Sequence, residues 1–211
     1  MNKTIPAIAV SAVLLAGCGS VNTTETKETK KSYVIYDIKV EDSVSATDMS
    51  QAIKKALQDN TNSVKIVEDL PPYPLPDESP RFQLTSPFGN KSSGIAALAG
   101  NIKIPTCNGA LVYAQATNDS MSSYGENTRF YTCLWQYKGG YHVDIYTEFE
   151  IESGGMHNLG VDLARNISGD SSQFIPKTIN NIRDNLEALN AEAKVIAAYP
   201  QELVQELNQT N

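Results

Sequence analysis

The spacing of apolar and polar residues along the chain predicts two kinds of element. Alternation with a period of two, typical of a strand with one buried face, occurs in the second half of Tyr33 to Val40 and throughout Tyr141 to Ile151. Apolar residues three to four positions apart, typical of an amphipathic helix, occur from Ala46 to Leu57 and from Ile175 to Leu189. The chain is therefore expected to combine strands with helices.

Weaker signals predict the remaining elements. Segments rich in β-branched and aromatic residues indicate further strands at Ser63 to Glu68, Arg81 to Leu84, Gly109 to Thr117, Thr128 to Tyr137 and Ala193 to Tyr199. Further helices are expected at Leu159 to Ile167 and Gln201 to Leu207, and Lys138-Gly139-Gly140 is expected to form a three-residue turn. This order predicts an α+β fold, a two-layer sandwich with a mostly antiparallel sheet and helices on one face, opening with a β-α-β unit.

Two segments interrupt the pattern, and each leaves two interpretations open. Leu70 to Pro80 holds five prolines in eleven residues, so it cannot form a regular helix or a central strand. We expect a stiff crossover, and the alternative is a docking segment for an aromatic-lined groove. Ser86 to Gly100 is a long connection with an apolar middle; we expect a lid over the core, and the alternative is an exposed contact patch.

The first eighteen residues form a separate unit. Lys3 and the free amine precede an apolar run from Ile5 to Leu15, which indicates a secretion signal. A membrane-spanning helix needs about 20 apolar residues, so this run is too short to span. The tetrad Leu15-Ala16-Gly17-Cys18 resembles the lipobox of bacterial lipoprotein precursors. That resemblance implies that Cys18 receives a diacylglyceryl group, that the leader is cleaved before it, and that the new amine is acylated.

The resemblance also divides the chain and implies its location. Residues 1–17 would be the signal peptide, 18–32 the lipidated cysteine with a flexible tether, and 33–211 a single α+β domain. The residue after Cys18 is Gly19 rather than Asp, which in this family favours the outer membrane, with the domain in the periplasm. Acyl chains on Cys18 would be the membrane contact, because two or more chains anchor a protein stably.

Charge and cysteine usage agree with an exported protein. Loss of Lys3 with the leader leaves 16 basic and 24 acidic residues, a formal charge of −8. This balance argues against nucleic acid as a partner and against electrostatic docking on anionic lipid. With Cys18 lipidated, Cys107 and Cys133 remain as a single possible pair, and we expect a disulfide worth about 3 to 4 kcal/mol. Two buried free thiols are the alternative.

Motifs for chemistry are not found in the sequence. It has none of the usual nucleotide-binding, zinc-protease or nucleophile-elbow signatures. His142, Asp144, Glu148 and Glu150 share one strand face, but neighbours at i and i+2 lie about 7 Å apart, too far to hold one metal without other strands. We expect a solvated acidic face, with no metal, no cofactor and no enzymatic activity.

Aromatic residues instead gather around the hairpin that carries Cys133. Tyr124, Trp135, Tyr137 and Tyr146 form a candidate contact surface, because rigid aromatic side chains make good anchors; their alternative role is cross-strand packing. The expected function is a non-catalytic envelope domain that contacts another envelope protein or the cell wall. The alternative is a carrier of a small ligand or lipid, with the loop from Ser86 to Gly100 covering an apolar pocket.

Overall fold

The computed structural model describes residues 26–41, 43–87, 103–119, 127–153 and 170–209. The elements follow in the order β1 (Thr26–Lys39), α1 (Ala46–Asn60), β2 (Ser63–Glu68), β3 (Gln83–Thr85), β4 (Ile104–Thr106), β5 (Val112–Asn118), β6 (Asn127–Tyr137), β7 (Gly140–Ser153), α3 (Asp170–Glu187), β8 (Glu192–Tyr199) and α4 (Glu202–Gln209). Each predicted element within these residues is present, with its ends shifted by a few positions. The helix predicted at Leu159 to Ile167 and most of the loop from Ser86 to Gly100 lie outside the described residues.

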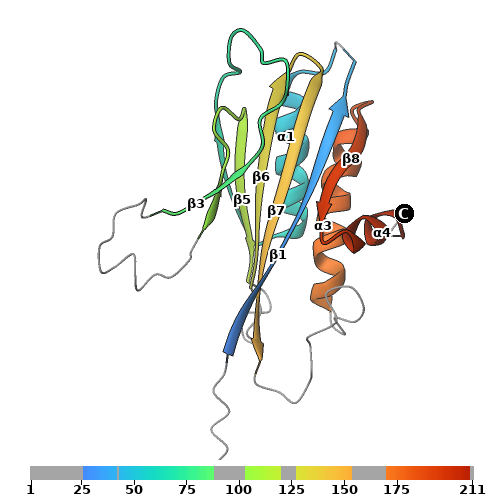
Figure 1. Ribbon diagram of the computed structural model, residues 1–211. Helices are drawn as coiled ribbons and strands as arrows, with labels where there is room; N and C mark the ends of the chain where they lie inside the picture. The colour runs from blue at the N-terminus through green and yellow to red at the C-terminus, as the bar shows by residue number, and fades with distance from the viewer. Residues whose placement is uncertain (1–25, 42, 88–102, 120–126, 154–169, 210–211) are drawn as a thin grey trace, which may run out of the picture.

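Six of the strands form one sheet in the order β2-β5-β6-β7-β1-β8, and every neighbouring pair is antiparallel. Helices α1 and α3 cover one face of this sheet (Figure 1), so the predicted α+β architecture is confirmed. Three strands separate β1 from β2 in the sheet. The opening β-α-β unit therefore spans most of the sheet and does not join neighbouring strands.

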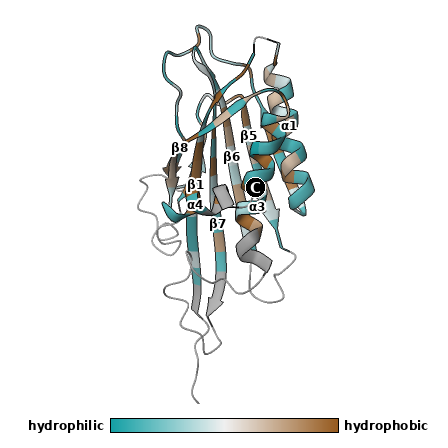
Figure 2. Cartoon of the chain, turned by 90° about the vertical axis from the view of Figure 1, so that its right-hand side faces the viewer, coloured by the Kyte–Doolittle hydropathy of each residue, from teal (hydrophilic) through white to brown (hydrophobic). Residues whose placement is uncertain are grey.

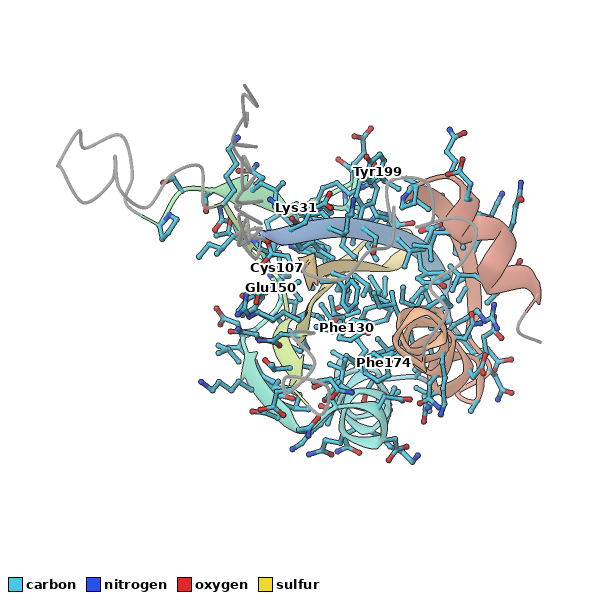
Figure 3. All side chains as sticks on the ribbon, turned by 90° about the horizontal axis from the view of Figure 1, so that it is seen from below. Lys31, Cys107, Phe130, Glu150, Phe174 and Tyr199 are labelled. Atoms are coloured by element: carbon cyan, nitrogen blue, oxygen red, sulfur yellow. A yellow bond between two sulfur atoms is a disulfide. The ribbon has the colours of Figure 1, made fainter. Side chains whose placement is uncertain are left out.

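The main core fills the space between the sheet and the two helices. Met49, Ile53 and Leu57 of α1 and Ile179, Ile182 and Leu186 of α3 are fully buried against the sheet. Phe130 of β6 meets Phe174 of α3 with ring centroids 5.7 Å apart (Figure 3). The opposite surfaces of the helices are largely hydrophilic (Figure 2), as expected of amphipathic helices packed on one side.

The predicted tether is wrong for its last seven residues, because β1 already begins at Thr26. Thr26 to Ser32 carry no apolar alternation, yet their backbone pairs with β7 from Thr26↔Ser153 to Ser32↔Thr147. In this register Lys31 stands opposite Glu148, an opposite-charge pair that favours the ladder. Alternation of apolar and polar residues therefore cannot identify this part of β1, whose pairing with β7 is supported by opposite charges.

The turn between β6 and β7 is also shorter than predicted. Tyr137 pairs directly with Gly140, so only Lys138 and Gly139 form the loop. Gly140 adopts a φ of +136°, and a Cβ placed there would lie 2.3 Å from the carbonyl oxygen of Ile38 in β1. Glycine is therefore required at this position both for its backbone conformation and for the close approach of β1.

We expect Gly140→Ala to lower the free energy of unfolding by about 2 kcal/mol or more, because strain and a backbone clash act together. Gly109 is the matched control, since its φ is +71° but a Cβ there meets no atom within 4 Å. Gly109→Ala should cost about 1 kcal/mol. Urea unfolding of both variants tests this, and equal losses would contradict it.

Candidate functional site

A proline-rich segment crosses the face of the sheet opposite the helices, here called the outer face. We call residues 69–82 the strap. It leaves β2 with Asp69 N–H donating to Leu111 O at 2.9 Å, passes the β6–β7 turn and runs into β3 (Figure 1). The Lys138 N–H donates to Pro76 O at 3.0 Å, and Lys138 Nζ lies 2.6 Å from Asp77 Oδ1. The segment is thus a crossover, as expected.

The far end of the strap is held by one aromatic residue. The Phe82 ring lies between Tyr33 of β1 and Tyr146 of β7, with ring centroids 5.7 and 5.4 Å away. Its backbone N–H donates to Asp144 Oδ2 at 3.0 Å. Apolar contact and a hydrogen bond to a buried carboxyl group therefore fix the same residue to the outer face.

A disulfide joins the segment that follows β4 to the outer face of the sheet. Cys107, which follows β4, is joined to Cys133 of β6 with their Cα atoms 5.8 Å apart, so the predicted pair is confirmed. Trp135 lies beside it on the same face of β6, and its Nε1–H donates to Asn108 O at 3.1 Å. Together with Ala110, these residues form a second, smaller core on the outer face.

The acidic strand face predicted to be solvated is covered along His142, Asp144 and Glu148, so that expectation is wrong for these three residues. Glu150, the fourth residue of that face, is half-exposed and pairs with Arg129 at 3.0 Å. Asp144 is fully buried, and His142 and Glu148 are buried as well. His142 Nδ1 lies 3.5 Å from Asp144 Oδ1, while the other Asp144 oxygen accepts the Phe82 N–H. Strand alternation gives the side on which a residue lies, but not whether a distant segment covers that side.

The predicted contact surface is largely contradicted for the same reason. Trp135 is 1% exposed and Tyr146 is 3% exposed, so neither can anchor a partner at the surface. Tyr137 is half-buried, and its hydroxyl donates to Asp37 Oδ1 at 2.5 Å. Tyr124 and the lipidation candidate Cys18 lie outside the described residues. Cross-strand packing is thus the role of Trp135 and Tyr146.

The buried tyrosines of the outer face hold their protons firmly. Burial, with a smaller contribution from the charge of Glu148, raises the pKa of Tyr131 to about 12. The same two causes raise the pKa of Tyr146, whose hydroxyl lies 3.4 Å from Glu148 Oε1. These phenols stay neutral near pH 7 and act as packing groups, and the Tyr146 hydroxyl also donates to Glu148.

A polar network closes the end of the sheet near the β6–β7 turn. Lys39 Nζ donates to the Tyr137 hydroxyl at 3.0 Å and to Gly139 O at 2.6 Å, and it lies 3.4 Å from Asp37 Oδ2. Burial opposes ionisation of Asp37, but the hydrogen bond from Tyr137 and the charge of Lys39 outweigh it and lower its pKa. The network ties β1 to β6 and is structural.

The residues best placed for contact are ones that the aromatic pattern did not select. Val67, Leu70 and Tyr73 are 64%, 84% and 99% exposed, and they lie where β2 passes into the strap. We call these three residues the β2 ridge. For Leu70 and Tyr73 the signal in the sequence is the proline-rich segment itself, because its prolines prevent a regular helix or a central strand.

Other classes of site gain no support in the part of the chain that the structure describes. Within it, no helix is long and apolar enough to span a membrane, and no three His, Cys, Asp or Glu side chains are grouped to hold a metal ion. No protein-family model, curated protein or solved structure matches the chain. Functional conclusions therefore depend on the chain's own residues.

Removing the disulfide should destabilise the domain without changing its fold. We expect the double variant Cys107→Ser and Cys133→Ser to lose about 3 kcal/mol of unfolding free energy, since the unfolded chain gains freedom. Urea unfolding measures the loss, and reduced wild-type protein is the matched control that should lose the same amount. An unchanged midpoint in both samples would contradict the prediction.

Tyr137→Phe should destabilise the protein in a pH-dependent way. The pKa of Asp37 is lower in the folded state than in the unfolded chain. Its ionised form therefore stabilises the fold at any pH above its pKa in the unfolded chain, and this stabilisation is lost as the pH falls through its pKa in the folded state. We expect a loss of about 1 kcal/mol at pH 7, shrinking once the pH falls below about 4. Urea unfolding of the wild type and the variant at pH 7 and at a pH below about 4 tests this. A loss of unfolding free energy that is the same at the two pH values would contradict it.

Proposed function

We propose that the protein is a lipoprotein of the bacterial envelope, anchored to the outer membrane by acyl chains on Cys18. Its domain then lies in the periplasm and contacts another envelope protein or the cell wall without catalysis. The tetrad Leu15-Ala16-Gly17-Cys18 after an apolar run is the observation that carries this proposal. Pairing of Cys107 with Cys133 supports it, because Cys18 is then the one cysteine of three left for lipidation.

The start of β1 would place the domain close to the membrane. Thr26 follows Cys18 by eight residues, and eight residues reach at most about 28 Å. The 14 residues of β1 extend about 45 Å from there. The end with the β6–β7 turn would therefore point away from the membrane, and the β2 ridge would lie toward that end because β2 runs in the same direction as β1.

A contact role is supported by what the surface offers. The β2 ridge holds three large apolar side chains within seven residues, and they are the three most exposed large apolar side chains in the part of the chain that the structure describes. The strap that carries Leu70 and Tyr73 is fixed at both ends by hydrogen bonds. A partner would therefore bind a surface that is already ordered, at a low entropic cost.

Mass spectrometry of protein purified from native envelopes tests the anchor. We expect a polypeptide that begins at Cys18 and carries the mass of the diacylglyceryl and acyl groups, and we expect Cys18→Ser to abolish the acyl mass. A chain that still begins at Met1, or one trimmed but without acyl mass, would contradict the proposal.

Photo-cross-linking in intact envelopes tests the contact role separately. A photoreactive phenylalanine analogue in place of Tyr73 should give one discrete adduct of higher mass. The matched position is Tyr199, which is also exposed but lies on β8 at the other edge of the sheet. The contact role of the β2 ridge would be contradicted by equal adducts at both positions, or by none at Tyr73.

A further inference from the structure

We propose that the free edge of β2 binds an extended segment of a partner protein, which adds to the sheet as an antiparallel strand beside β2. This inference builds on the contact role proposed above and specifies its surface and mode. Strand addition of this kind takes its affinity from backbone hydrogen bonds and its specificity from alternate side chains. Three features of β2 point to it: its unpaired backbone groups, its regular register and the ridge beside it.

The register identifies the backbone groups that are free. In an antiparallel ladder, every second residue of a strand exchanges backbone hydrogen bonds with one neighbouring strand. The backbone N–H and C=O groups of the residues between them point to the opposite side of the strand. Asp69 N–H donates to Leu111 O, so the odd-numbered residues of β2 bond to β5. The N–H and C=O groups of Val64, Ile66 and Glu68 therefore point away from β5, and in the described part of the chain β2 pairs with no other strand.

The β6–β7 turn gives the same alternation independently. Tyr137 and Gly140 close a two-residue loop, and the closing pair of such a hairpin exchanges both hydrogen bonds. Odd residues of β6 therefore bond to β7 and even residues bond to β5. The registers of β5–β6 and β2–β5 carry this alternation across the sheet. It again points the backbone N–H and C=O groups of the even-numbered β2 residues away from β5, toward the free edge.

The two edges of the sheet differ in how well they are protected. The register of β8 against β1 shifts between Ile35 and Tyr36, and a bulge of this kind makes an edge poorly suited to further pairing. The register of β2 runs unbroken from Ser63 to Glu68. In Figure 3, β2 forms one flank of the molecule, next to α1. β2 is thus the regular edge of the sheet.

The side chains of β2 define the chemistry of the segment that would fit. On the outer face, Lys65, Val67 and Asp69 follow one another at alternate positions, and all three are exposed. An antiparallel strand that places an acid opposite Lys65, an apolar residue opposite Val67 and a base opposite Asp69 would be complementary. On the other face, half-buried Val64 and Ile66 favour apolar residues opposite them.

A second copy of the chain does not fit this edge when both copies are anchored in one membrane. Antiparallel pairing of two β2 strands inverts one copy and raises the start of its β1 by about 45 Å. The eight residues from Cys18 to Thr26 reach at most about 28 Å. Parallel pairing in register would set Lys65 beside Lys65 and Glu68 beside Glu68, which is unfavourable. The occupant is therefore a different protein.

Hydrogen exchange with a synthetic peptide tests the proposal. The probe is the capped peptide Lys-Lys-Val-Ile-Glu-Val-Thr, written to lie antiparallel from Asp69 to Ser63, with the mature chain carrying Cys18→Ser. In the free protein, the amides of Val64, Ile66 and Glu68 should exchange faster than those of Lys65 and Val67. Excess peptide should slow those three amides by about tenfold or more and leave the other two unchanged.

Matched variants separate this edge from the other. Val67→Lys should abolish the protection, because it removes the apolar contact and adds a charge typical of blocked edges. Ile196→Lys, at an exposed position on β8, should leave the protection intact. A peptide with its Lys and Glu residues exchanged should protect less.

Four results would overturn the proposal. They are no protection, equal loss of protection in both variants, protection of β8 instead, and protection that rises with protein concentration without peptide, which would identify a second copy as the occupant. Since this experiment needs no lipid, its failure leaves the anchor to be judged by mass spectrometry and the wider contact role by cross-linking.

Discussion

The attachment of the strap to the outer face is the constraint on which the rest of the structure depends. In the part of the chain that the structure describes, the helices cover one face of the six-stranded sheet, and the other face carries large aromatic residues and a fully buried carboxyl group. Exposed to water, Trp135 and Tyr146 would forfeit the stabilisation of apolar burial. Buried without a donor, Asp144 would be costly. Phe82 meets both needs, because its ring packs on the aromatic residues and its N–H bonds to the carboxylate.

The disulfide makes this cover durable in an oxidising compartment. It joins the segment after β4 to the middle of β6, close to the point where Trp135 donates to Asn108 O. The long connection between β2 and β5 thus contacts the main sheet at three places: at the β6–β7 turn, at Phe82 and at Cys107. The described helices lie on one face of the sheet, and the other face is covered by the proline-rich strap and by the segment that carries Cys107.

Local patterns predicted the architecture because helices and strands are decided over a few residues. The alternation in Tyr141 to Ile151 correctly separated Val143 and Ile145, which face the helices, from His142 and Asp144. It could not show that Phe82, some sixty residues earlier in the chain, packs on this face and donates its N–H to Asp144. For the same reason the sequence alone predicts Trp135 and Tyr146 to be surface contacts, whereas both are buried. Thr26 to Ser32 were missed because their strand is defined by its pairing with β7 and not by its own side chains.

With the outer face covered, the most exposed large apolar side chains of the described residues lie at the β2 edge of the sheet and at the start of the strap. Groups that suggested chemistry, such as His142 and Asp144, are enclosed, while apolar side chains are displayed where the strap begins. The proline residues that keep the strap out of regular structure leave Leu70 and Tyr73 exposed. One segment therefore both seals the sheet and presents the β2 ridge beside its open edge.

Fluorescence of the tryptophan tests the central claim most directly, since Trp135 is the only one in the chain. If the strap and the disulfide cover the outer face, the oxidised protein should emit at short wavelength and resist quenching by acrylamide, and replacing Phe82 by alanine should shift the emission toward that of indole in water. Emission typical of exposed indole, quenched as readily in the wild type as in the unfolded chain, would contradict the account.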